Sequence, residues 1–430
     1  MPACAQAKGA VMIAASTATH GWNARIIYAM LFMLPVAGIS VRHWLSGSFL
    51  VLTLLSLPQL FRKHGELTKE ERVFLAICAA FFAVFVISAL VNGWTDLQTR
   101  FLGREIRFLF IIPIYLMVRR YPDAGVWLLR GCVIGAPVIL AHSLIDVLIL
   151  KKPFAEGAYS QLLLGPFAAL LALWLLSAWR LEDSKYFRRL IPVAIIAALV
   201  SVALSGVRGA YLGLLALISV WVATNLKRRD LIIAGIATVI VVLAAFSLFA
   251  TVADRTKLAF VELNAYMHTD NAATLEGRFN VPQGRLGSVS ARLEMWHVAV
   301  LIFKDNPIIG VGRGNYINEV GKYVERGLVH REVTQHSQPH NAFLEMMVSK
   351  GFLGLVVLLA LLFYPLSYFI RTFTLSPDTA MLGIIHIVGF ATFSLAESAP
   401  FIKGNFITIF LVFLATFFAW HVQRVRQGGS

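Results

Sequence analysis

Long apolar runs separated by short basic loops are the feature that most constrains this chain. A membrane-spanning helix needs about 20 consecutive, mostly apolar residues, because a backbone in lipid must satisfy its own hydrogen bonds. Ten runs of the chain meet this requirement clearly. Two weaker runs also predict spans: 25–40 is short, and 100–118 starts with charged residues. We therefore expect an all-α integral membrane protein with about twelve transmembrane helices. These lie at 25–40, 44–61, 73–93, 100–118, 125–150, 159–179, 190–206, 209–225, 231–252, 341–370, 379–396 and 404–421.

The composition supports this class. Hydrophobic residues make up 58% of the chain and charged residues 14%, whereas a soluble domain has about 25% charged residues. The net charge of +15 does not indicate nucleic-acid binding, since Lys and Arg lie in short loops between apolar runs and act there as topology signals. Cys4, Cys78 and Cys132 are scattered and form no disulfide or zinc pattern. We expect no metal and no cofactor.

The distribution of Lys and Arg predicts the orientation of the chain. With both termini in the cytoplasm, the short cytoplasmic segments hold about three times as many basic residues as the short loops opposite. The chain then divides into three parts. Residues 1–252 form helices 1–9 with short loops, residues 253–340 form one large cap that faces away from the cytoplasm, and residues 341–430 form helices 10–12.

The cap should contain one amphipathic helix near 291–304. Leu293, Trp296, Val300 and Phe303 recur at helical spacing, Ser290 is a candidate N-cap, and Asn306-Pro307 should end the helix.

Three glycines follow that helix. Gly310, Gly312 and Gly314 do not follow a strand, so the dinucleotide-binding interpretation fails. We expect these glycines to let the backbone pack closely, with Arg313 as a candidate anion contact.

Ionisable residues at the outer ends of the spans are candidates for function because charge in a membrane is costly. Arg100, Arg104 and Arg107 share one face of the fourth predicted helix, and Arg208 lies in a very tight turn. Guanidinium groups suit phosphate oxygens. For the three on the fourth helix, snorkelling to headgroups or pairing with Glu105 remains the alternative.

Other polar residues near the same surface leave two interpretations open. His142 and Asp146, at i and i+4, are either a proton relay or an interfacial polar pair. The role of Glu397, which directly follows the eleventh predicted helix, is open in the same way.

The segment from His336 to Glu345 leads into the tenth predicted helix. Pro339 suits a first helical turn, which would place His340 and Asn341 in that turn. The positive end of the helix dipole disfavours imidazolium, so His340 should be neutral and able to accept a proton. A capping role is the alternative. His336 lies four residues earlier, and no third ligand stands at zinc spacing.

Four motifs in this order resemble the O-antigen ligase superfamily. They are Ser205-Gly-Val-Arg-Gly-Ala-Tyr-Leu-Gly-Leu214, Ser290-Ala-Arg-Leu-Glu-Met-Trp296, Asn306-Pro-Ile-Ile-Gly-Val-Gly-Arg-Gly-Asn315 and Pro339-His-Asn-Ala-Phe-Leu-Glu345. That superfamily also contains O-antigen polymerases and protein O-oligosaccharyltransferases.

The resemblance implies a GT-C type membrane glycosyltransferase of lipopolysaccharide biosynthesis. Such ligases transfer O-antigen from undecaprenyl diphosphate to a sugar hydroxyl of lipid A–core oligosaccharide. They act at the periplasmic face of the inner membrane, with inversion and without a metal ion.

The motif positions imply roles for individual residues. His340 corresponds to the essential histidine of the ligases, and Arg208 and Arg292 correspond to their essential arginines. Further expected substrate contacts are Arg100, Arg104, Arg107, Arg313, His336 and Asn341. The alternatives are a polymerase or protein O-oligosaccharyltransferase of the same superfamily and, outside it, a secondary transporter. For the transporter we find no paired interrupted helices.

Overall fold

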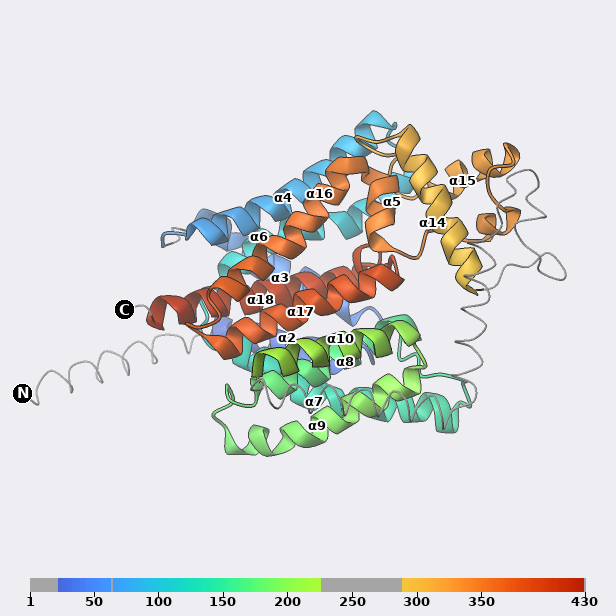
Figure 1. Cartoon of the computed structure of the whole chain (residues 1–430). Coiled ribbons are helices and arrows are strands. Elements are labelled where there is room, and N and C mark those ends of the chain that lie inside the picture. Colours follow the sequence, from blue (N-terminus) through green and yellow to red (C-terminus); the bar gives the residue numbers. More distant parts are fainter. Residues whose placement is uncertain (1–21, 63–64, 226–287, 429–430) are drawn as a thin grey trace, which may run out of the picture.

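The computed structural model describes residues 22–62, 65–225 and 288–428, and all regular secondary structure within these ranges is helical. Eight of the described helical segments are long and apolar enough to cross a membrane (Figure 1). Seven of them are α3 with η1 (Trp44–Ser56, Leu57–Phe61), α4 (Lys69–Val91), α7 with η2 (Ala124–Leu144, Ile145–Ile149), α8 (Gln161–Ala178), α9 (Lys185–Ser205), α16 (Ala342–Arg371) and α17 (Pro377–Ala396). The eighth, Gly404–Gln427, lies within α18 (Gly404–Gly428).

These spans support a multi-pass membrane protein but not the expected number of about twelve. Helices α2 (Trp22–Gly38) and α10 (Arg208–Asn225) occupy two further expected positions. The expected span 231–252 and the cap residues 253–287 lie outside the described residues.

The expected single helix 100–118 is wrong. The chain instead forms α5 (Asp96–Glu105) and α6 (Arg107–Val118), which are interrupted at Ile106. The interruption coincides with the buried carboxylate of Glu105, which pairs with Lys350 at 2.9 Å. A hydropathy pattern does not reveal such a tertiary contact.

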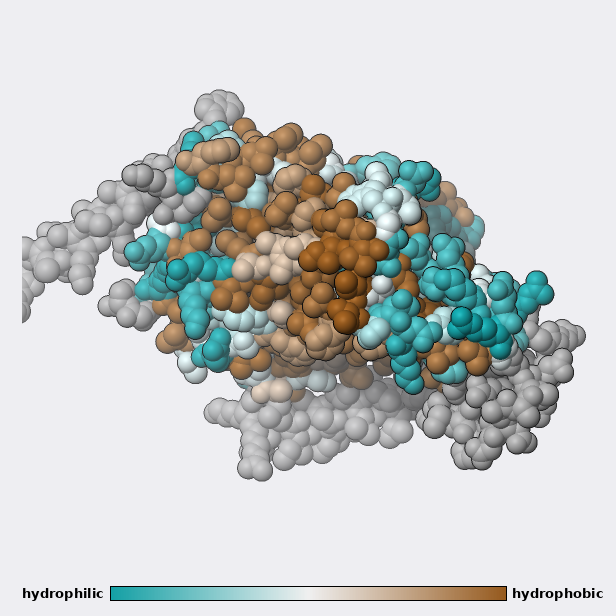
Figure 2. Space-filling view, turned by 90° about the horizontal axis from the view of Figure 1, so that it is seen from above, coloured by the Kyte–Doolittle hydropathy of each residue, from teal (hydrophilic) through white to brown (hydrophobic). Residues whose placement is uncertain are grey.

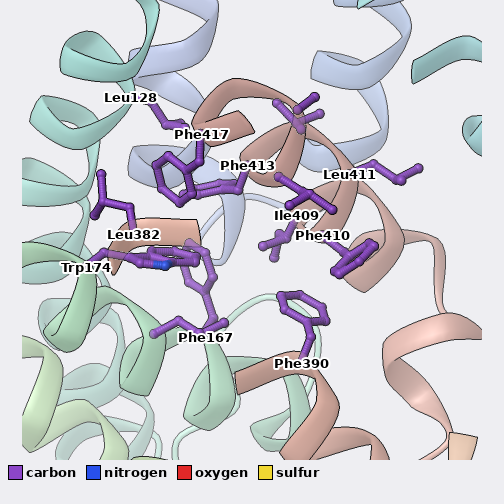
Figure 3. Close-up of a cluster of buried hydrophobic side chains, with 14 of the residues drawn as sticks. Leu128, Phe167, Trp174, Leu382, Phe390, Ile409, Phe410, Leu411, Phe413 and Phe417 are labelled. Carbon is purple, nitrogen blue, oxygen red and sulfur yellow. The ribbon is translucent and has the colours of Figure 1, made fainter. Parts of the chain in front are cut away.

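Helix α18 is the centre of the bundle. Its most apolar window is 94% buried, against 33% for α4 and for α9. Figure 3 shows Phe413 and Phe417 of α18 close to Trp174 of α8, and the rings of Trp174 and Phe413 stack at 4.5 Å. A helix that is apolar on all sides and buried on all sides forms a core, whereas one buried on a single side faces lipid.

The face of the molecule in Figure 2 is hydrophobic in the middle and hydrophilic at both ends. Exposed apolar side chains on α9 and α10 include Val193, Ile196 and Leu212. In water such a surface would be unfavourable, but it suits a bilayer.

The described part of the cap lies at the end of the bundle opposite the C-terminus (Figure 1). It comprises α14 (Ser288–Asp305), α15 (Tyr316–Glu325) and η3 (Arg331–Gln335), and it has a small apolar core of its own.

Helix α14 covers the segment 291–304, but its buried face differs from the expected one. Leu293, Trp296, Val300 and Phe303 are only partly buried. Glu294 explains the rotation: it is fully buried, and its carboxylate accepts a hydrogen bond from the backbone N–H of His330 at 2.8 Å. A satisfied carboxylate can occupy an inward position that a polarity pattern assigns to solvent. The residues that do face inward are Ala291, Met295, Val298, Ala299 and Ile302.

The loop after α14 is joined to α16 at a kink in that helix, where Gly351 has non-helical φ/ψ. The N–H groups of Val311 and Gly312 donate to the carbonyls of Val348 and Ser349, at 2.8 and 3.1 Å. In return, the N–H of Phe352 donates to the carbonyl of Pro307 at 2.7 Å. We call this pairing of residues 307–312 with 348–353 the backbone crossing.

Glycine allows the backbone crossing to be this close. Gly310 and Gly351 have φ values of 70° and 65°, which L side chains rarely adopt. A Cβ at Gly310 would lie 2.4 Å from the Val348 carbonyl oxygen, and one at Gly351 2.3 Å from the Ile308 carbonyl carbon. The close backbone packing expected for Gly310 is therefore present.

Replacing either crossing glycine should destabilise the protein. We expect Gly310→Ala and Gly351→Ala each to cost about 1–3 kcal/mol, because each places a Cβ in a strained, occupied position. Thermal unfolding in detergent measures the effect. The matched control is Gly321→Ala in α15, where a Cβ meets nothing within 4 Å and the helix should gain up to about 1 kcal/mol. Equal melting temperatures for all three variants would contradict the prediction.

Candidate active site

Three segments distant in sequence meet at the cap end of the bundle. They are the start of α14, the turn 336–341 before α16, and the residues after α17. The His340 Nδ1 lies 3.0 Å from the Glu397 Oε2, and the Arg292 Nη2 lies 3.4 Å from the Glu397 Oε1. Arg292 also donates through Nη1 to the carbonyl of Ala396 at 2.6 Å. Glu397 thus joins a histidine of the turn to an arginine of the cap.

Hydrogen bonds fix the turn that carries His340. The side-chain oxygen of Asn341 accepts from the N–H groups of Phe343 and Leu344, so Asn341 is the N-cap of α16. Its backbone N–H donates to Ser398 Oγ at 2.9 Å. On the other side of the turn, the Trp296 indole donates to the carbonyl of Pro339 at 3.0 Å.

The expected placement of His340 in the first turn of the helix is wrong. Because Asn341 caps α16, the helix begins at Ala342, and Pro339 and His340 lie outside it. His340 has a φ of 51°, in the left-handed region that non-glycine residues rarely occupy. Strain of this kind is retained where the surroundings over-determine the position, often at functional sites. The helix-dipole argument for a neutral imidazole therefore does not apply.

The geometry instead defines which nitrogen of His340 can act as a base. The Glu397 carboxylate only accepts hydrogen bonds when ionised, so the neutral imidazole carries its proton on Nδ1. The lone pair is then on Nε2. Because the His340 side chain remains 25% exposed, the site can be reached from water.

His336 stands beside His340, with the two ring centroids 5.7 Å apart. The pKa of His336 is lowered, first by its partial burial and then by the positive charges of His340 and Arg292, while Glu332 opposes the shift. His336 is thus a second imidazole that favours its neutral form.

Arg208 opens α10 at this same end, and its side chain is exposed. The first turns of α10 lie along the last turns of α17: a Cβ at Gly209 would lie 3.4 Å from the Cβ of Ala396, and one at Gly213 would meet Phe393. Arg208 therefore starts its helix beside the residue that precedes Glu397. Among the described residues, the Arg208 side chain has no ion-pair partner.

Arg313 lies apart from His340, inside the protein. It is 2% exposed and its guanidinium contacts Glu105 and Glu345, each at 3.4 Å. It also donates to the Phe401 carbonyl at 2.6 Å. With Lys350, these residues form a buried ion-pair network that leaves Arg313 no surface for an anion, contrary to the expected contact.

The three arginines expected on one helical face are separated. Arg107 donates to the Gly404 carbonyl, to Thr408 Oγ1 at 2.6 Å and to Ser46 Oγ at 3.1 Å, so α6 is tied to α18 and α3. Arg104 lies over the ring of Phe101 at 4.8 Å, and Arg100 is exposed.

Other polar residues also have different partners from those expected. Asn341 is 8% exposed and acts as a helix cap. Asp146 pairs with Lys152 at 2.9 Å rather than with His142.

The sequence left the role of Glu397 open. Its position just after a span marked it as polar at the membrane boundary, but its partners are 57 and 105 residues away in the chain. Nothing local in the sequence identifies that contact.

Known proteins offer two points of comparison. Residues 193–359 match a family model described as O-antigen ligase. This match supports membership of the O-antigen ligase superfamily. The match includes Arg208, Arg292 and His340, whereas Glu397 lies beyond it. A relative from Haemophilus influenzae (strain ATCC 51907 / DSM 11121 / KW20 / Rd), named an uncharacterized protein, is 26% identical over 350 residues, which are 78% of this chain and 83% of that one.

The network around Arg313 predicts that substitution of Lys350 lowers the stability of the protein. Lys350→Met leaves Glu105 without its 2.9 Å partner, and breaking a buried pair typically costs about 3–5 kcal/mol. The double variant Glu105→Gln/Lys350→Met should recover part of the loss. Thermal unfolding in detergent tests this.

The matched control for that experiment is Lys322→Met. Lys322 is 57% exposed and pairs with Glu319 at the surface, where such a substitution costs about 0–1 kcal/mol. If the two Lys→Met variants melt alike, the buried network does not stabilise the fold.

Proposed function

We propose that the protein is an O-antigen ligase that transfers polysaccharide from undecaprenyl diphosphate to a sugar hydroxyl of lipid A–core oligosaccharide. In this proposal the transfer inverts the anomeric centre and needs no metal ion. The observation that supports it most is the arrangement of His340, Glu397 and Arg292 beside Arg208 at one end of the membrane helices. A base and two cations at a membrane boundary suit a donor whose leaving group is a lipid diphosphate.

His340 is the proposed general base. Its Nε2 takes the proton of the acceptor hydroxyl as that oxygen forms a bond to the anomeric carbon of the donor. The bond from that carbon to the diphosphate oxygen breaks, and the electron pair leaves with undecaprenyl diphosphate. Glu397 at Nδ1 keeps the imidazole in the required tautomer and stabilises the imidazolium that forms, as carboxylates do in catalytic triads.

Arg208 and Arg292 are the proposed diphosphate ligands. Charge grows on the diphosphate oxygens as the bond breaks, and guanidinium donors fixed beside that position stabilise it. Arg292 is 35% exposed despite its pair with Glu397, so part of it can face a ligand. Arg100 and Arg104 could contact more distant anionic groups of the substrates, while Arg107 and Arg313 serve the fold.

The cap end is the proposed periplasmic end, with both termini in the cytoplasm and the protein in the inner membrane. The excess of Lys and Arg in the short loops of the opposite end supports this orientation. A site at the helix ends is open to both lipid and water, which two amphipathic glycolipid substrates require.

An O-antigen polymerase is the nearest alternative. It would use the same donor and the same base but a lipid-linked glycan as acceptor, so the acceptor distinguishes the two. A protein O-oligosaccharyltransferase would glycosylate a Ser or Thr instead, and a secondary transporter would depend on an ion gradient.

Reconstitution tests the ligase proposal. Purified protein, lipid-linked O-antigen and lipid A–core are mixed in the presence of EDTA, and ligated product is resolved on a gel. We expect ligation by the wild type and a loss of about 10²–10⁴-fold in His340→Ala. His336→Ala tests the neighbouring imidazole and should lose less activity than His340→Ala. Elongation of lipid-linked glycan without transfer to core would contradict the ligase proposal and support the polymerase alternative.

The role of Glu397 predicts a separate kinetic signature. In Glu397→Gln the amide can donate to Nδ1 and trap the wrong tautomer, so kcat should fall by about 10²–10⁴-fold. The KM of the acceptor should change little, whereas the KM of the donor can change because Arg292 loses its carboxylate partner. Glu397→Asp should retain more activity than Glu397→Gln. A surface control is Glu319→Gln, which removes only an exposed pair with Lys322. Unchanged kcat in Glu397→Gln would refute the orienting role.

A further inference from the structure

Asp146 holds a loop that no step of the proposed reaction uses. Its side chain is 1% exposed and lies in η2, a π-helical turn at the end of α7. One carboxylate oxygen pairs with Lys152 at 2.9 Å, and the other accepts the N–H groups of Glu156 and Gly157, both at 2.9 Å. A single buried carboxylate therefore fixes residues 152–157, which we call the outer loop.

The outer loop packs on the turn that precedes Arg208. The N–H of Ala155 donates to the carbonyl of Leu204 at 2.9 Å. Phe154 covers Gly206 so closely that a Cβ at Gly206 would lie 2.2 Å from its ring, and Gly206 has a φ of 64°. The turn can take this left-handed conformation because residue 206 is glycine, and Phe154 covers it there.

From this turn the chain enters α10 at Arg208. The N–H of Val207 donates to Ser205 Oγ at 3.3 Å, and Ser205 is fully buried against Gly165 of α8. The backbone up to residue 207 is thus held from two sides, whereas the Arg208 side chain is exposed. The position of Arg208 is set by the packing of the backbone before it. No ion pair with another described residue holds its side chain.

We propose that Asp146 is a positioning residue for Arg208: through the outer loop it fixes the guanidinium where the diphosphate of the lipid donor binds. The inference rests on the proposed function of Arg208. Asp146 itself touches no substrate, because its carboxylate is buried and fully engaged. A rigid helix start fixes the Cα and Cβ of Arg208, so only the side-chain rotamers have to be ordered when it binds an anion.

Donor binding gives the direct test. The dissociation constant for undecaprenyl diphosphate is measured in detergent by tryptophan fluorescence, alongside ligation, for Asp146→Asn, Arg208→Ala and the double variant. We expect Asp146→Asn to weaken binding by about 10- to 100-fold, which corresponds to the loss of a hydrogen bond to a charged group. In the Arg208→Ala background, Asp146→Asn should cause no further loss.

A second variant and a control separate positioning from folding. Phe154→Ala changes a partly exposed side chain and should weaken donor binding in the same way. Glu182→Gln is the matched control: Glu182 pairs with Arg130 at 2.8 Å and accepts the N–H of Ser184, but at the other end of α8. It should leave donor binding unchanged.

The outcomes distinguish the two proposals. Losses that add in the double variant, or an equal loss in Glu182→Gln, would overturn the role of Asp146 and leave that of Arg208 intact. Unchanged binding in Arg208→Ala would overturn both the diphosphate-binding role and the positioning role built on it. Loss in Asp146→Asn and Phe154→Ala, absent in the Arg208→Ala background, supports the inference.

Discussion

The backbone crossing between residues 307–312 and 348–353 is the constraint on which the site depends. These two segments of the chain can hydrogen-bond this closely only because Gly310 and Gly351 lack a Cβ. The crossing fixes the cap to α16, and Arg313, just beyond it, reaches the carbonyl of Phe401 from inside the protein. The cap and the segment after α17 are therefore held by the same short stretch of chain. Arg292 and Glu397 meet because those two parts are held together.

Some cationic side chains of this protein pair with buried carboxylates, whereas others are exposed and could bind a ligand. At the end away from the cap, Arg119 and Arg426 both reach the fully buried Glu71. At the cap end, Arg313 and Lys350 are neutralised by Glu105 and Glu345. Burying a charge without a partner is costly, so these cations belong to the fold. Among the described residues of the candidate site, Arg208 is exposed and Arg292 is partly exposed. The proposed anion-binding role rests on this difference and not on the total charge.

Local patterns predicted the local features of the structure. Apolar runs located most of the helices, the Asn306-Pro307 pair marked the end of α14, and the glycines after it indicated close backbone packing. Features set by distant contacts could not be predicted. The inward rotation of α14 depends on the bond from His330 to Glu294, and the break at Ile106 coincides with Glu105 reaching Lys350. Likewise the motif around His340 drew attention to it, but its partner Glu397 is known only from the fold.

The distribution of the site over two structural units has a chemical consequence. His340 and Glu397 are attached to the ends of membrane helices, whereas Arg292 belongs to the cap. Glu397 contacts the His340 imidazole from the bundle, whereas the cap holds the neighbouring Pro339 carbonyl through Trp296 and balances the charge on Glu397 through Arg292. The cap thus supplies two contacts to this cluster, the guanidinium of Arg292 on Glu397 and the indole of Trp296 on the Pro339 carbonyl. The proposed base and one proposed diphosphate ligand are therefore held in one cluster by contacts between the cap and the helix ends.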